Sequence, residues 1–95
     1  MIQDMLAERD KTHGSYIQVA NLTRSLMANM EYSKNWNELY PFQQESLHMI
    51  AVKIARILEG DPDQLDSPLD IAGYSMLMFE NLKRIQSNEK VEKPD

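Results

Sequence analysis

The sequence has no cysteine, and only three glycines and four prolines among its 95 residues. Without cysteine, disulfide frameworks and thiolate chemistry are excluded, as is usual for proteins of a reducing compartment. No apolar run approaches the roughly 20 residues that a membrane-spanning helix needs. The first ten residues include Asp4, Glu8 and Asp10 and do not resemble a signal peptide. We therefore expect a cytoplasmic protein with no membrane partner.

Positive charge is also scarce, because 15 acidic residues stand against 10 basic ones and give a formal charge of −5. Duplex nucleic acid is bound by neutralising its phosphates with lysine and arginine, so no duplex nucleic-acid partner is expected. A local pocket of basic residues is still compatible with this charge. Apolar residues are plentiful at 42%, with seven methionines, which is enough for one compact core.

Apolar residues recur with the helical period of 3.6, and no segment alternates with the period of a strand. The pattern predicts an all-α fold, a bundle of four helical segments over about residues 2–11, 16–30, 41–59 and 68–85. Ser15 and Ser67 are the expected N-caps of the second and fourth helices, and Gly60 ends the third. Residues 31–43 are interpreted as a packed connection with a short helical turn that Asn35 caps.

Residues 1–85 are expected to form a single helical domain, and residues 86–95 a disordered polar tail. The third predicted helix is apolar on two sides, so it is sandwiched between neighbours or between a neighbour and another subunit. We therefore expect a homo-oligomer. Gly73 lies inside the fourth predicted helix, where it favours the close approach of another backbone or of a ligand. The expected core face of the third helix lies within about a 100° arc and consists of Leu47, Ile50, Ile54, Ile57 and Leu58.

Charged and hydroxyl side chains could meet between the third and fourth predicted helices: Glu45, Lys53, Arg56, Asp70 and Tyr74. As a binding site, Lys53 and Arg56 would contact phosphate oxygens. Glu45 and Asp70 would then hold a divalent cation. As a structural network, Arg56 would pair with Asp70, and a hydrogen bond from Tyr74 would fix the helix register. The structural interpretation is favoured, because ion-pair networks collect the same residue types.

The two histidines give weaker signals. His13 precedes Gly14 in the first loop and is either a ligand contact or a capping imidazole. His48 has no second histidine or cysteine at metal-ligand spacing, so a zinc site is not expected. The sequence also lacks a nucleophile motif, a glycine-rich phosphate loop and a Glu-Glu-x-x-Glu run, so covalent catalysis is unsupported.

Three segments together resemble a phage and prophage family of small proteins, similar to the MazG-like, all-α nucleoside triphosphate pyrophosphatases: Arg9–Tyr16, Gln44–Leu58 and Asp70–Tyr74. The resemblance implies a MazG-like bundle completed as a dimer or tetramer, with magnesium held by acids. It also implies a nucleotide between the third and fourth helices, contacted by Lys53, Arg56, Tyr74 and His13. Magnesium would bind Glu45 and Asp70. Active enzymes carry a Glu-Glu-x-x-Glu helix that this chain matches only at Glu45, so its metal site is depleted.

Three functions stay open at this point. The first is a nucleotide-binding protein of nucleotide metabolism with weak or no pyrophosphohydrolase activity. The second is a phage-encoded interaction protein that inhibits a host or defence component in the host cytoplasm, with Trp36 and Tyr40 as exposed rings. The third is a structural oligomer without a ligand.

Overall fold

The computed structural model describes residues 1–88, and within them it contains no β-strand, so the predicted all-α class is confirmed. In chain order the elements are α1 (Ile2–His13), α2 (Tyr16–Glu31), the short 3-10 helix η1 (Trp36–Glu38), α3 (Pro41–Glu59) and α4 (Asp66–Asn88). No helix in this part of the chain combines the length and the apolar character that crossing a membrane requires.

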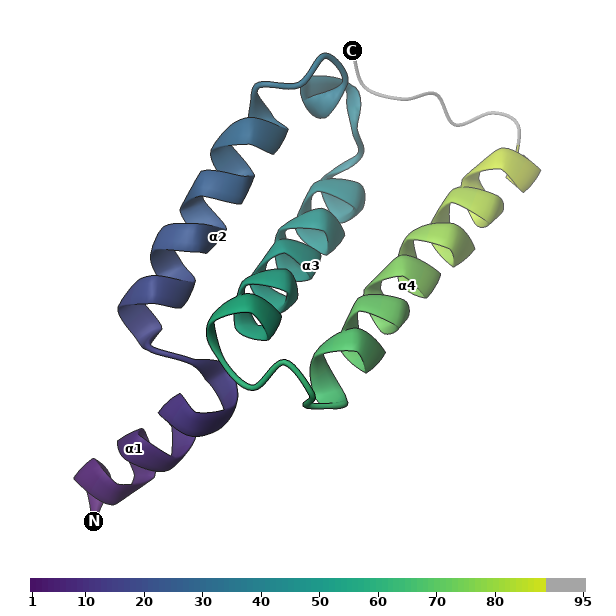
Figure 1. The fold of residues 1–95 in the computed structure, drawn as a ribbon. Helices are drawn as coiled ribbons and strands as arrows, with labels where there is room; N and C mark the ends of the chain where they lie inside the picture. Colours follow the sequence, from purple (N-terminus) through teal and green to yellow (C-terminus); the bar gives the residue numbers. More distant parts are fainter. Residues whose placement is uncertain (89–95) are drawn as a thin grey trace.

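Three helices lie side by side in one layer, with α3 between α2 and α4, and α1 extends beyond one end of that layer (Figure 1). The molecule is accordingly elongated, at 53 × 25 × 23 Å. The two apolar sides of α3 are explained by this arrangement, because α2 and α4 both pack against it. α3 therefore lies between two helices of its own chain, which is one of the two arrangements predicted for a helix with two apolar sides.

The buried core is small. Its apolar members are Met27 on α2, Tyr40, and the two alanines Ala51 and Ala55 on α3, all at most 9% exposed, and no large side chain in the described residues is fully buried. The predicted core face of α3 is only partly correct, because Leu58 is 64% exposed. None of its five members is buried, because the buried apolar side chains of α3 are Ala51 and Ala55, and Leu47, Ile50 and Ile54 line a hollow beside α2 and η1.

Local signals place most helix ends. Pro41 begins α3 and Gly60 caps its end, as predicted. Ser15 is the N-cap of α2, although its side chain makes no capping hydrogen bond. A capping-box interaction forms instead at the start of α3, where the Tyr40 amide donates to Oε1 of Gln43 at 2.8 Å.

The bounds of α4 differ from the prediction at both ends. The helix includes Asp66 and Ser67, so Ser67 lies in the first turn and is not the N-cap. Pro68 is tolerated at its third position, because first-turn amides have no partner within the helix. At the other end α4 continues to Asn88, so residues 86–88 are helical and not part of a disordered tail. The prediction for residues 89–95 lies outside the described residues.

The connection between α2 and α3 is packed, as predicted. Tyr40 is only 9% exposed and stacks on Phe42, with ring centroids 5.5 Å apart. The interpretation of Tyr40 as an exposed ring is therefore wrong, because the ring packs at the start of α3. Trp36 begins η1 and is half-buried.

Two glycines hold α1 against the end of α3. A Cβ atom on Gly60 would lie 2.6 Å from the carbonyl oxygen of Thr12, and one on Gly14 would lie 2.6 Å from that of Glu59. The amide of Asp61 also donates to the Thr12 carbonyl at 3.2 Å. Because Gly14 has φ 82°, a conformation that side chains disfavour, both loops depend on glycine at this contact. The contact fixes where α1 meets the layer.

Candidate functional site

The predicted α3–α4 network is only partly assembled. Lys53 and Asp70 form an ion pair with Nζ and Oδ2 3.0 Å apart, and the Lys53 side chain is only 12% exposed. The expected pair between Arg56 and Asp70 is not formed, because α4 packs on the side of α3 that presents Lys53. Tyr74 lies half-buried on α4 near Asp70, and its hydroxyl makes no hydrogen bond within residues 1–88.

Arg56 lies instead on the wall of a cavity of about 560 Å³ between α1, α2 and α3. His13 contributes from the end of α1, so these two of the predicted phosphate contacts do come together. Neither Lys53 nor Tyr74 lines this cavity, which we call the α1–α3 cavity. Its charged and polar lining residues are Arg9, Asp10, His13, Tyr16, Thr23, Arg24, His48 and Arg56.

The lining of the α1–α3 cavity is strongly basic for a chain with a formal charge of −5. Three arginines, Arg9, Arg24 and Arg56, stand against one carboxylate, that of Asp10. Within residues 1–88, none of the three guanidinium groups takes part in an ion pair, whereas Lys53 is neutralised by Asp70. Guanidinium groups bind phosphate and carboxylate oxygens through paired N–H donors, so the cavity is suited to an anion.

His48 connects one arginine of the cavity to Glu45. Nη2 of Arg24 lies 3.2 Å from Nε2 of His48, and Nδ1 of His48 lies 3.7 Å from Oε1 of Glu45. Since arginine can only donate, Nε2 accepts and Nδ1 carries the imidazole proton toward the carboxylate. Glu45, whose side chain is 69% exposed, therefore lies next to His48 and does not itself line the cavity.

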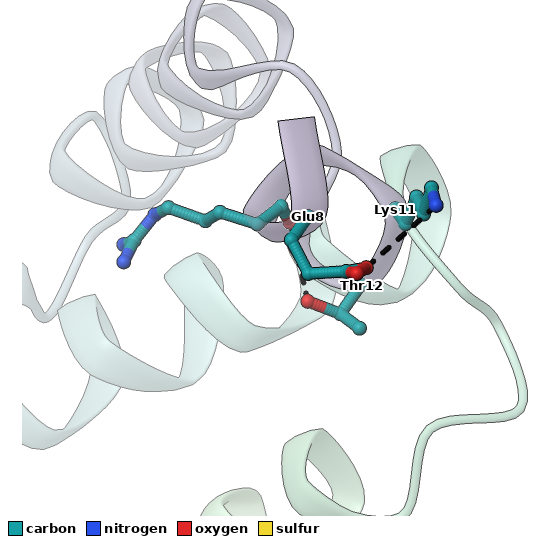
Figure 2. A network of polar contacts seen from close by, with 4 residues as sticks. Glu8, Lys11 and Thr12 are labelled. Carbon is teal, nitrogen blue, oxygen red and sulfur yellow. Dashed lines mark hydrogen bonds and ion pairs between the residues drawn. The ribbon is translucent and has the colours of Figure 1, made fainter. Parts of the chain in front are cut away.

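His13 is held at the cavity by the last turn of α1. The hydroxyl of Thr12 donates to the Arg9 carbonyl oxygen at 3.1 Å and lies 2.9 Å from Nδ1 of His13. These contacts assign the imidazole proton to Nδ1 and leave Nε2 unengaged among the described residues. Figure 2 shows Thr12 beside an exposed ion pair on the same helix, in which Lys11 and Glu8 lie 3.7 Å apart. Nδ1 of His13 also lies 3.3 Å from the Arg9 carbonyl oxygen, which is the contact of a capping imidazole, and His13 lines the cavity as well, so both predicted alternatives stay open.

One buried polar group of the cavity is unsatisfied. Thr23 lines the cavity from α2 and is 4% exposed, and its hydroxyl has no hydrogen-bond partner among residues 1–88. A buried hydroxyl without a partner is unfavourable by about 1–3 kcal/mol. A bound ligand with a suitable oxygen would relieve this cost.

The predicted metal ligands are not gathered. Within residues 1–88, no group of three or more histidine, cysteine or acidic residues could hold a metal ion. Glu45 is eight residues from Lys53, the partner of Asp70, which is roughly 12 Å along α3. Within residues 1–88, Glu45 and Asp70 are therefore not brought together at one cation site.

Sequence reasoning assigned no role to Arg9, Arg24 or Thr23. Arg9 is on α1 and the other two are on α2, and only the packing of α1 and α2 brings them to Arg56. Comparison with protein-family models, with curated proteins and with solved structures finds no match to this chain.

Proposed function

We propose that this chain binds a small phosphate-bearing molecule, a nucleotide in the first instance, in the α1–α3 cavity. The observation that carries this proposal is the convergence of three arginines without ion pairs, Arg9, Arg24 and Arg56, on one cavity of an acidic chain. Positive charges around one cavity repel one another, and an anion bound between them relieves that repulsion.

The size and the apolar part of the cavity support a nucleotide over free phosphate. Ligand sites for small molecules have volumes of about 300–1,000 Å³, and this cavity measures about 560 Å³. Its apolar wall, which includes Leu6, Val19, Ala20 and Val52, would contact a base, while the arginines contact the phosphates. The resemblance to MazG-like pyrophosphatases implies the same ligand class, although it would place the nucleotide between α3 and α4.

Magnesium would bind in the cavity together with the phosphate groups of the ligand. Mg²⁺ commonly binds through one or two carboxylates together with substrate phosphates and water, and Asp10 is the carboxylate in the lining. Cleavage of a triphosphate needs a positioned base and several ordered oxygen ligands for the metal. We therefore propose binding with weak or no pyrophosphohydrolase activity.

A thermal-shift screen tests the proposal with inorganic phosphate, pyrophosphate and nucleoside mono-, di- and triphosphates, each with and without Mg²⁺. A ligand of the folded state raises the unfolding midpoint, by about 2.7 kcal/mol of stability at 100 times its Kd. We expect the nucleotides to raise the midpoint of the wild-type chain and Arg56→Ala to lose most of that rise. Arg84→Ala is the matched control, because Arg84 does not line the cavity.

The responses of the Lys53→Ala and Arg56→Ala variants distinguish a ligand between α3 and α4 from one in the α1–α3 cavity. Loss of the ligand effect in Lys53→Ala, with Arg56→Ala unaffected, would place the nucleotide between α3 and α4 and contradict the α1–α3 site. No effect of any phosphate compound on the wild-type chain would contradict the function itself.

A second candidate function is contact with another protein, a host or defence component if the chain is phage-encoded. The observation that favours it is a hollow of about 390 Å³ at the α2–η1–α3 junction, lined largely by apolar residues that include Leu26, Met30, Trp36, Leu39, Ile50 and Ile54. Exposed apolar hollows with an aromatic residue are common at protein interfaces. A Trp36→Ala chain that keeps its helical spectrum and its nucleotide response but loses inhibition of a target would support this function.

A further inference from the structure

The outer face of α4 carries a regular apolar stripe that nothing in the described chain covers. Leu65, just before α4, is followed on the helix by Leu69, Ala72, Met76 and Phe79, at intervals of four, three, four and three residues. Leu65 is 80% exposed, Leu69 68%, and Met76 and Phe79 56% each. This is the spacing of the contact positions of a coiled coil, which normally face a partner helix.

A hollow borders this stripe at Gly73, and Asp70 and Tyr74 also line it. Gly73 lies beside Ala72, and nothing is within 4 Å of the place where its Cβ would be. Leu69, Met76 and Leu77 rise around the hollow. Glycine inside a helix is less stable than alanine by about 0.5–1 kcal/mol, and packing within the chain does not explain it here. A hollow between larger side chains is the shape into which a side chain of another helix fits.

The exposed area is also larger than a compact monomer would have. The surface is 7236 Å², whereas a folded chain of 11.0 kDa exposes about 5,600 Å². Residues 89–95 can contribute about 1,200 Å² at the very most, at roughly 1.45 Å² per dalton of unfolded chain. The remaining excess is about 400 Å², roughly half of the 800 Å² or so that each partner buries in a standard interface.

The charges along α4 favour one orientation of a partner copy. Asp66 stands at the start of the helix, just after the acidic loop that holds Asp61 and Asp63, whereas Lys83 and Arg84 stand near its end. Glu80 is the one acid beside these basic residues. Two parallel copies would place like ends together, but two antiparallel copies place each acidic start beside the basic end of the other.

We propose that two copies of this chain associate through the α4 stripe as an antiparallel, two-fold symmetric pair. With Ala72 and Gly73 near the symmetry axis, Leu69 of each copy lies against Met76 of the other. A two-fold interface uses the same patch on both copies, and this stripe is self-complementary in that sense because Leu69 and Met76 stand on either side of the small residues Ala72 and Gly73. This pairing is independent of the ligand in the α1–α3 cavity.

Sedimentation velocity between about 1 and 200 µM, a range spanning ordinary dimer affinities, tests the association. We expect a dimer for the wild-type chain and a monomer for the double variant Leu69→Glu, Met76→Glu. Leu58→Glu is the matched control, since Leu58 is 64% exposed but lies on α3. This control should stay dimeric. A wild-type chain that stays monomeric at all these protein concentrations would overturn the proposal and indicate that a different partner covers the stripe.

The absence of cysteine allows the orientation to be tested in an otherwise native chain. Ala72→Cys, close to the proposed axis, should form a disulfide between copies in the presence of oxidised glutathione. Leu65→Cys, far from the axis, should not. Efficient cross-linking at both positions would show a parallel pair, and cross-linking at neither would show that α4 is not the interface. Either result would overturn the proposed arrangement.

Discussion

Lys53 and Arg56 are three residues apart on α3 and yet meet different surroundings. Lys53 faces α4 and is neutralised by Asp70, whereas Arg56 faces the α1–α3 cavity. Asp70→Asn should therefore leave a lysine that is only 12% exposed without its counter-charge. We expect a loss of about 1–3 kcal/mol in the free energy of unfolding, measured with urea.

The control for this variant is Glu8→Gln, which breaks the exposed ion pair to Lys11 on α1 (Figure 2), where both side chains are more than 70% exposed. Exposed pairs contribute little, so its effect should stay within about 0.5 kcal/mol. Equal effects of the two substitutions would show that the Lys53–Asp70 pair is no more important for stability than a surface pair.

Gly60 is the residue at which the loop after α3 touches the loop after α1. An added Cβ would meet only backbone, with the Thr12 oxygen at 2.6 Å and the Gly14 nitrogen at 2.7 Å. Gly60→Ala must therefore separate the two loops, and we expect a loss of about 1–3 kcal/mol in chemical denaturation. Gly73→Ala, at protein concentrations below self-association, meets no atom within 4 Å. It should stabilise the chain by about 0.5–1 kcal/mol.

At the scale of elements, α1 differs from the other α-helices because it has no buried residue. It nevertheless supplies Leu6, Arg9, Asp10 and His13 to the cavity. A helix with so little burial opens locally at low free energy, so its amides should exchange with solvent faster than those of α3. Saturating nucleotide should slow exchange across α1 and leave the outer half of α4 unchanged, as measured by hydrogen exchange with mass spectrometry. Unchanged exchange in α1 on binding would place the ligand elsewhere.

Helix positions were largely predictable, and the pairing of side chains between helices was not. Pro41 and Gly60 are local signals, so the bounds of α3 follow from the sequence alone. Lys53 and Arg56 point about 60° apart around a helix of 3.6 residues per turn. Which of them meets Asp70 is decided by the side on which α4 packs, and no local pattern contains that information. The same limit applies to the cavity, whose arginines come from three helices.

At the scale of the whole molecule, the overall negative charge and the positive charge of the cavity have opposite effects on an approaching anion. The formal charge of −5 repels an anion at long range, while three arginines attract it inside the cavity. Because salt screens charges over a Debye length of about 10 Å at 0.1 M, and chloride competes for the guanidinium groups, nucleotide affinity should fall as NaCl is raised. Isothermal titration calorimetry from low to high salt measures this. An affinity that rises with salt would show that overall repulsion controls binding, contrary to the proposed site.

The arginines themselves allow the most direct test of the α1–α3 site. The chain has four arginines, and Arg9, Arg24 and Arg56 line the cavity while Arg84 lies near the end of α4. In an NMR titration of the ¹⁵N-labelled chain with a nucleoside triphosphate, the side-chain Nε–H signals report each guanidinium group separately. The account predicts saturable shifts for the three cavity arginines and none for Arg84. Shifts that are absent, or equal for all four arginines, would contradict it.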